Sequence, residues 1–279
     1  MATLSTDAVT GLTVDAAGHR TNYHDSGSGS PLVLLHGSGP GVSAYSNWGP
    51  VMPALARDFR VVAPDIAGYG LTELKDDGRY DMRLWVAHLV AFLDAVGVER
   101  AVLVGNSFGG ALSLATAVFH PDRVAGLVLL GTPAGDFPMT DGLRSGWSYE
   151  PTPENMRESL LRFPYDPAVV TDEMVAQRHA LSARPGAQEA FRRLIPEPTG
   201  APDELVHGPS AGFLARVTAP AVVLHGREDR VVPPQAALFS STHLPDADLH
   251  VYGRCGHWVQ LERPDAFVRE VGLLAERCG

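Results

Sequence analysis

Five apolar runs without polar alternation constrain the fold of this chain more than any other feature. They lie at 32–35, 61–62, 101–104, 127–130 and 221–224, and segments with helical spacing such as 84–96 separate them. A strand with one solvent-exposed face alternates apolar and polar residues, so these runs indicate a mainly parallel sheet that is buried on both faces. We therefore predict an α/β fold whose sheet is flanked by helices, with ligand sites beyond the carboxyl ends of the strands. Residues 11–25 have the pattern of an antiparallel hairpin at one edge.

The segment 132–216 interrupts this pattern, because it is rich in proline and has no apolar strand run. Thr152 before Pro153 and the cap residue Thr171 predict the starts of two helices, and a third is expected over 186–194. We predict a helical lid inserted after the sixth strand. The chain then divides into a first part of the core at 1–131, the lid at 132–216 and a second part of the core at 217–279. A disordered insert is disfavoured because the segment has aromatic residues to bury.

Residues 102–110, VLVGNSFGG, combine an apolar run, a glycine-flanked serine and the start of an alanine- and leucine-rich helical pattern. Strand, sharp turn and helix form the context in which a GxSxG sequence is a nucleophile elbow. The turn exposes the serine at its apex, so Ser107 is the candidate nucleophile. A βα turn that contains serine by chance is the alternative.

A serine hydroxyl needs a base within hydrogen-bond reach and a third group that orients the base. Asp229 follows the run 221–224, and His257 follows the strand-like sequence DLHVYG. The order Ser107, Asp229, His257 is the one expected for a triad on a parallel sheet. Glu228 and Asp65 are rival carboxylates for the third position. We interpret the strand-end residues His36 and His225 as structural.

Acyl chemistry also requires donors directed at a developing oxyanion. The amide of Phe108, directly after the nucleophile, is one candidate. The second is the amide of Ser38 in the glycine-rich loop HGSGPG, where the backbone can approach a substrate closely. A phosphate-binding loop is weakly supported, since neither GKS nor GKT follows.

Charge and composition exclude several classes of function. The net charge of −10 argues against a nucleic-acid surface and means that an anionic ligand must be held by local cations. No apolar run approaches the ~20 residues of a membrane span, and no secretory signal is visible, so a cytoplasmic protein with no membrane partner is expected. The two cysteines have no metal-ligand spacing, and we expect neither a metal nor a cofactor.

The motifs HGSGPG with Asn47 downstream, GNSFGG, HGREDRVVP and GRCGHW resemble those of the α/β-hydrolase fold over nearly the whole chain. Within that superfamily they look most like the meta-cleavage product hydrolases, which break a carbon–carbon bond in bacterial aromatic degradation. The resemblance implies an anionic 2-hydroxy-6-oxohexa-2,4-dienoate as the small-molecule substrate, cleaved between C5 and C6. It also implies a homodimer or higher oligomer. A carboxylesterase or lactonase with the same triad is the alternative.

The same resemblance implies roles for further residues. Arg178 corresponds to the arginine that holds the substrate carboxylate, Asn47 and Asn106 match polar contacts of the carboxylate and 2-oxygen, and Trp258 matches an aromatic residue that packs on the dienoate. Trp147 and Val231 are expected in the acyl pocket. The sequence leaves open the C6 substituent, the size of the oligomer, and whether Ser107 forms an acyl-enzyme or His257 activates water.

Overall fold

The computed structural model describes the whole chain except residues 1–8, 76–78, 147, 196, 202 and 279. Its centre is an eight-stranded sheet in the order β1-β2-β4-β3-β5-β6-β9-β10, in which only the pairings of β2 are antiparallel. The strands are β1 Leu12–Ala16, β2 His19–Ser26, β3 Pro31–Leu35, β4 Arg60–Pro64, β5 Ala101–Asn106, β6 Val124–Leu130, β9 Ala221–Gly226 and β10 Ala247–Tyr252. The predicted hairpin and all five predicted strand runs are confirmed.

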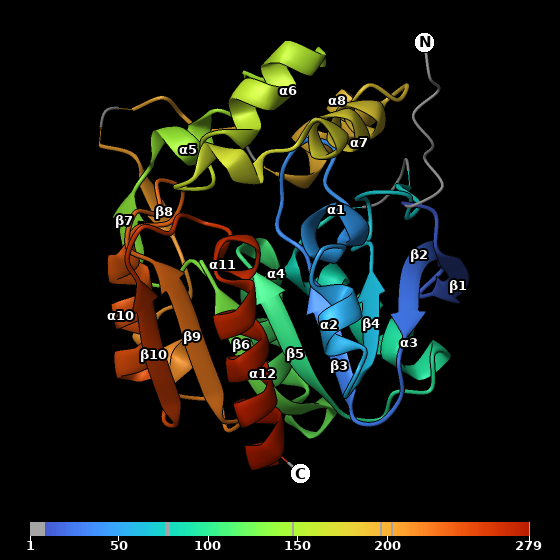
Figure 1. The fold of residues 1–279 in the computed structure, drawn as a ribbon, viewed down its shortest axis with the longest axis vertical. Coiled ribbons are helices and arrows are strands. Elements are labelled where there is room, and N and C mark those ends of the chain that lie inside the picture. The colour runs from blue at the N-terminus through green and yellow to red at the C-terminus, as the bar shows by residue number, and fades with distance from the viewer. Residues whose placement is uncertain (1–8, 76–78, 147, 196, 202, 279) are drawn as a thin grey trace.

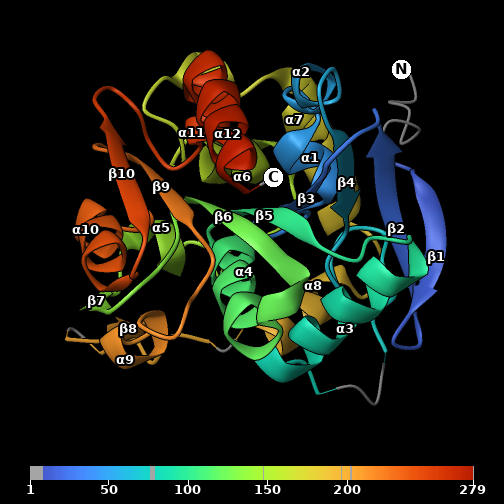
Figure 2. The same ribbon diagram turned by 90° about the horizontal axis from the view of Figure 1, so that it is seen from below.

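Helices cover both faces of the sheet, as Figure 2 shows. On one face lie α1 Ala44–Trp48, α2 Met52–Leu55, α11 Val259–Glu262 and α12 Pro264–Cys278; on the other lie α3 Met82–Ala95, α4 Phe108–Phe119 and α10 Pro234–His243. Strand β3 shows why its run has no polar alternation: Leu32 and Leu34 pack toward one face, while Val33 and Leu35 pack toward the other. The α/β-hydrolase architecture predicted from the sequence is present. No helix in the described part of the chain is both long and apolar enough to cross a membrane.

The segment between β6 and β9 forms a cap over the carboxyl ends of the strands, at the top of Figure 1. Its helices are α5 Asp141–Arg144, α6 Pro153–Leu160, α7 Asp172–Ser182 and α8 Ala187–Leu194. The last helix of the segment, α9 Ala211–Leu214, packs instead beside α10, and its Phe213 contacts Phe119 at the end of α4. The predicted caps Thr152 and Thr171 are confirmed, because each side chain accepts a hydrogen bond from the third residue of its helix. The division at 131 and 216 stays a prediction.

One feature of this segment differs from the expectation of helices alone. Strands β7 Asp136–Pro138 and β8 Leu205–His207 pair antiparallel in a separate two-stranded sheet. Each has three residues, which is too short to produce a recognisable alternation in the sequence. This small sheet ties the start of the lid to its end.

An apolar cluster, which we call the lid cluster, joins the lid to the core. Its buried members are Tyr149, Met156, Leu160, Val170, Val175 and Trp258. Trp258 lies at the start of α11 in the core and stacks on Phe163 of the lid, with ring centroids 4.8 Å apart. The lid is therefore held by buried apolar contacts, whose contribution is roughly 25 cal/mol per Å² of apolar area removed from water.

The turn between β5 and α4 is strained and closely packed. Ser107 has a φ of 53°, which a residue with a side chain seldom adopts. A Cβ added to Gly109 would lie 2.0 Å from the carbonyl oxygen of Leu35, and one added to Gly110 would lie 1.9 Å from the Thr132 hydroxyl. Glycine is therefore required for α4 to start against the ends of β3 and β6.

Gly109→Ala should lower the free energy of unfolding by about 2 kcal/mol or more, because the new methyl group overlaps backbone that cannot move away. Gly272 in α12 has open space around it, so Gly272→Ala should be neutral or stabilising by up to about 1 kcal/mol, as expected for a helix interior. Urea unfolding of both variants measures the difference. Equal stability of the two would contradict the packing described here.

Candidate active site

The three predicted catalytic residues lie beyond the carboxyl ends of β5, β9 and β10. Nδ1 of His257 is 2.7 Å from Oδ2 of Asp229, and both side chains are fully or almost fully buried. Asn106, next to Ser107, donates from Nδ2 to the carbonyl oxygens of Leu130 and His257, at 3.2 and 3.4 Å. These bonds bring the histidine loop against the elbow, so the residues predicted from three distant motifs share one site.

The Asp229 carboxylate is held as an anion. Oδ1 accepts hydrogen bonds from the backbone amides of Val231 and Val232, at 2.8 and 3.0 Å. Burial alone would raise the pKa of Asp229, but the neighbouring imidazoles of His257 and His225 outweigh it and hold the pKa well below its usual range. The carboxylate is therefore charged at neutral pH and can orient the imidazole of His257.

The rival carboxylates have other partners. Glu228 accepts hydrogen bonds from the Arg227 guanidinium and the Cys255 amide. Asp65 accepts hydrogen bonds from the amides of Ala44 and Leu71, and it therefore braces the loop after β4. Burial raises the pKa of Asp65 to about 6.

The glycine-rich loop after β3 lies directly beside the elbow, because the strand order reverses between β3 and β5. A Cβ on Gly37 would lie 3.5 Å from Cβ of Ser107. His36 fixes the start of this loop: its Nε2 accepts the Ile66 amide at 2.9 Å, so Nδ1 carries the proton and donates to the Gly37 carbonyl oxygen at 2.7 Å. Burial lowers the pKa of His36 to about 4, and the charge of Arg178 adds to this effect, so the imidazole is neutral and structural.

The two predicted oxyanion donors are the amides of Ser38 and Phe108. Ser38 lies in the loop beside the elbow, and Phe108 is the first residue of α4. The partly buried Phe108 ring packs edge-on against Trp85, with centroids 4.7 Å apart. Amides at a helix N-terminus suit a developing negative charge, and the two donors stay a prediction.

Arg178 in α7 is the buried cation of the site. It is only 4% exposed, its Nε has no hydrogen-bond partner, and it has no ion pair with any carboxylate among the described residues. A Cβ on Gly39 would lie 3.4 Å from Nη2, so the guanidinium faces the glycine-rich loop. Burial lowers the pKa of Arg178 to about 10, which still leaves it charged. An unpaired buried cation is costly, and a carboxylate ligand would satisfy it.

Asn47 in α1 is also buried with an unsatisfied donor. Its Oδ1 accepts the Gly37 amide at 3.5 Å, while its Nδ2 has no partner within the described part of the chain. The Asn106 Nδ2 group, in contrast, is committed to backbone carbonyls. A substrate contact by Asn106 would therefore have to come from Oδ1, which lies 3.3 Å from the Cβ that Gly37 lacks.

Trp258 and Val231, two of the remaining predicted residues, lie where the lid meets the core. Trp258 belongs to the lid cluster, and Val231 belongs to a neighbouring apolar cluster with Phe137, Val232 and Ala236. Trp147 lies outside the described residues. No group of three or more potential metal ligands is present in the regions that the structure describes.

The chain was compared with known proteins. Residues 30–264 match the family model described as alpha/beta hydrolase fold. The chain is 46% identical to 2-hydroxy-6-oxo-2,4-heptadienoate hydrolase of Pseudomonas putida, over 95% of this chain and 96% of that protein. It is 45% identical to 2-hydroxymuconate semialdehyde hydrolase of Pseudomonas sp. strain CF600, over 95% and 94%. The solved meta-cleavage product hydrolase of Pseudomonas fluorescens IP01 superimposes with a TM-score of 0.91 at 42% identity, over 97% and 99%.

The chain belongs to the meta-cleavage product hydrolases. The family resemblance inferred from its motifs is therefore confirmed.

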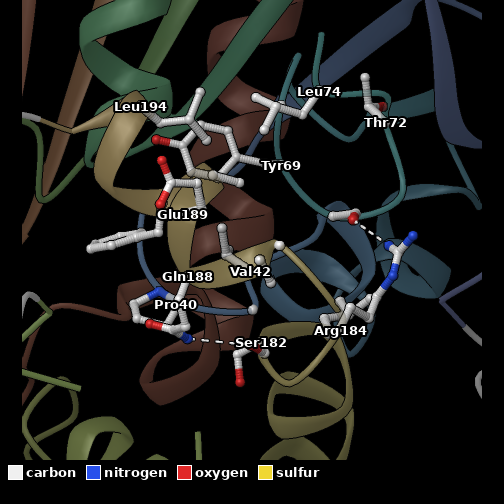
Figure 3. Close-up of a pocket in the computed structure, with 18 of the residues that line it drawn as sticks. Pro40, Val42, Tyr69, Thr72, Leu74, Ser182, Arg184, Gln188, Glu189 and Leu194 are labelled. Carbon is white, nitrogen blue, oxygen red and sulfur yellow. Dashed lines mark hydrogen bonds between the residues drawn. The ribbon is translucent and has the colours of Figure 1, made fainter. Parts of the chain in front are cut away.

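A cavity of about 460 Å³ in this hydrolase lies next to the site, between α8 and the loops 39–42 and 68–74 (Figure 3). Arg184 bridges its rim by donating to the Gly70 carbonyl oxygen at 3.1 Å, and Gln188 donates to the Ser182 carbonyl oxygen at 3.2 Å. Gly39 is common to the cavity wall and to the surroundings of Arg178. Ser107, Asp229 and His257 do not line this cavity, so it borders the chemistry and does not contain it.

Sequence reasoning missed two buried polar groups of this hydrolase. Gln260 in α11 is fully buried and donates from Nε2 to the Asn47 carbonyl oxygen at 3.4 Å. The Tyr149 hydroxyl is 2.7 Å from the Ser182 hydroxyl, on the same helix as Arg178. Gln260 stands two residues after the end of the motif GRCGHW, so only its proximity to that motif could have indicated it.

Arg178→Met should raise the free energy of unfolding of the ligand-free protein by about 1 kcal/mol, because an apolar side chain of similar length replaces an unpaired buried charge. Arg157→Met is the matched control: Arg157 forms a partly exposed ion pair with Asp172, and its loss should change stability by less than about 0.5 kcal/mol. Urea unfolding at neutral pH compares the two. A marked loss of stability in Arg178→Met would show that the guanidinium is satisfied within the protein.

Proposed function

We propose that this hydrolase cleaves the C5–C6 bond of a 2-hydroxy-6-oxohexa-2,4-dienoate, forming a 2-hydroxypenta-2,4-dienoate and a carboxylic acid. The observation that carries the proposal is the unpaired guanidinium of Arg178, buried beside a serine elbow and an aspartate–histidine pair. An ordinary ester needs only the elbow and the pair. A substrate with a carboxylate at one end and a carbonyl at the other needs both features.

The polar half of the site would bind the carboxylate and the 2-oxygen. Arg178 supplies charge-assisted hydrogen bonds to the carboxylate, and the free Nδ2 of Asn47 supplies a further donor. Ketonisation moves the 2-hydroxyl proton to carbon and produces a 2-oxo group. When the C5–C6 bond breaks, its electron pair remains on C5 and delocalises onto that oxygen, where a buried cation stabilises the charge.

The triad would perform the addition at C6. His257, oriented by the Asp229 carboxylate, accepts the proton of the nucleophile, which is the Ser107 hydroxyl or a water molecule. The C6 carbonyl oxygen would become an oxyanion, and the amides of Ser38 and Phe108 would donate hydrogen bonds to it. Collapse of the oxyanion breaks the C5–C6 bond, and protonation of the 2-oxygen of the resulting dienolate gives the 2-hydroxypenta-2,4-dienoate. The acyl group leaves as the carboxylic acid, directly if water was added or after water hydrolyses an acyl-Ser107 ester.

We infer a small C6 substituent, hydrogen or methyl. The relatives at 46% and 45% identity carry the names of a heptadienoate hydrolase and a semialdehyde hydrolase. A relative whose name specifies an aminophenyl substrate is 33% identical. Val231 would line the pocket for the acyl group. Trp147 is the second residue that the sequence predicts for this pocket.

Self-association also stays a prediction, which light scattering of the purified protein tests.

The purified protein should bleach the near-ultraviolet or visible absorbance of 2-hydroxy-6-oxohexa-2,4-dienoates, with kcat/KM highest for hydrogen or methyl at C6 and lower for phenyl. Ser107→Ala should reduce turnover by a factor of at least about 10³, since the elbow loses its hydroxyl. Stopped-flow absorbance with a C6 series measures both effects. No loss of absorbance with any member would refute the proposed reaction.

A carboxylesterase or lactonase is the second candidate, favoured by the 26% identity of a solved esterase and of a structure titled as an N-acyl homoserine lactone degrading enzyme. Arg178→Met separates the two candidates. For the carbon–carbon hydrolase, the variant should lose roughly 10²-fold or more in kcat/KM for dienoates, as expected for a buried charge pair, and should retain hydrolysis of a neutral ester. If wild-type protein hydrolyses the ester much faster than any dienoate, the second candidate is correct.

A further inference from the structure

A second imidazole contacts the carboxylate of Asp229. His225 is the fifth residue of β9, and its side chain is fully buried. Its Nε2 is 3.3 Å from Oδ2 of Asp229 and 2.9 Å from the carbonyl oxygen of Val232. We propose that His225 is a positioning residue: its Nε2–H, which donates to the Val232 carbonyl oxygen, also faces Oδ2 and holds the Asp229 carboxylate in register with His257. This inference rests on the proposed catalytic role of Asp229.

The neighbours of His225 decide its tautomer. Both groups near Nε2 are acceptors, a carboxylate oxygen and a carbonyl oxygen, so Nε2 must carry a proton. Nδ1 is buried and has no hydrogen-bond partner within the described residues. The Nε2–H donates to the Val232 carbonyl oxygen at 2.9 Å and lies 3.3 Å from Oδ2 of Asp229. His225 therefore links the Asp229 carboxylate to the turn at Val232.

Asp229 has three hydrogen bonds and one further polar contact. Oδ1 accepts the amides of Val231 and Val232, and Oδ2 is 2.7 Å from Nδ1 of His257. Nε2 of His225 lies 3.3 Å from the same Oδ2. The amides hold Oδ1, so the orientation of Oδ2 toward His257 depends on the groups around Oδ2. His225 approaches this oxygen from strand β9 itself.

The other titratable groups around Asp229 are few among the described residues. The Cys255 thiol lies in the same loop as His257, and burial raises its pKa to about 12, so it is neutral. Glu228 is directed to Arg227 and to the Cys255 amide. The balance of charge at Oδ2 is therefore set by His225 and His257.

Loss of the His225 N–H should slow the reaction of the nucleophile and shift the acid limb of the pH profile to higher pH. The Asp229 carboxylate would rotate more freely, so the nucleophile would react more slowly. The negative charge of Oδ2 would also bear on His257 alone, which favours the imidazolium and moves the acid limb of the pH profile to higher pH. A role in packing alone would lower thermal stability and leave the acid limb in place.

The test measures the rate at which Ser107 is labelled by a fluorophosphonate probe between pH 5 and 9, so it does not depend on the dienoate substrate. His225→Leu, which lacks the donor, should slow labelling roughly 10- to 100-fold and raise the midpoint of the acid limb. His225→Gln can present an amide proton near the position of Nε2 and should stay within about threefold of wild type. His88→Leu is the matched control: His88 is also buried and is 2.8 Å from the Thr21 hydroxyl, on the far edge of the sheet.

The proposal is supported if His225→Leu shifts the acid limb while His225→Gln and His88→Leu do not. It is overturned if His225→Leu leaves the acid limb unmoved, or if the Gln variant is as slow as the Leu variant. The test of His225 can be distinguished from the test of the proposed reaction. Wild-type protein that is labelled but bleaches no dienoate would refute the proposed reaction, and the comparison of the variants would still decide the role of His225.

Discussion

The contact on which the site depends is the close approach of α4 to the carboxyl ends of β3 and β6. Because Gly109 and Gly110 have no Cβ, the first turn of α4 lies against the Leu35 carbonyl oxygen and the Thr132 hydroxyl. This approach holds Ser107 in its strained backbone conformation and sets the loop after β3 beside it. The strand order reverses between β3 and β5, so the sheet topology alone places the elbow and the glycine-rich loop next to each other.

The electrostatics of the site complement this rigid backbone. The chain carries a net charge of −10, yet its active-site region holds a buried arginine with no ion pair among the described residues. Long-range repulsion of an anionic substrate and short-range attraction by Arg178 act over different distances, since solvent screens the first over about 10 Å and the protein interior strengthens the second. The ligand-free site is therefore destabilised in the one place where a carboxylate would bind.

The sequence was informative where chemistry follows from a short motif on a strand end. The common location of Ser107, Asp229 and His257 could be predicted, because the first two follow apolar runs, the third follows a strand-like sequence, and the carboxyl ends of parallel strands share one edge of the sheet. The paired strands β7 and β8 could not be predicted, because three residues carry no periodicity. The burial of Arg178 depends on how the lid docks, and it distinguishes Arg178 from other lid arginines such as Arg157 and Arg162 only after folding.

The contact of His225 with Asp229 could not be predicted from the sequence either. A histidine at the end of an apolar strand is normally a packing residue, and the sequence offers no reason to interpret this one otherwise. Only the turn at 229–232 brings the carboxylate back over the strand end, so that one imidazole faces the carboxylate from the strand and another from the loop after β10. The acid of a triad is therefore best described by everything that holds it. In this chain the end of β9, two backbone amides and two imidazoles surround the Asp229 carboxylate.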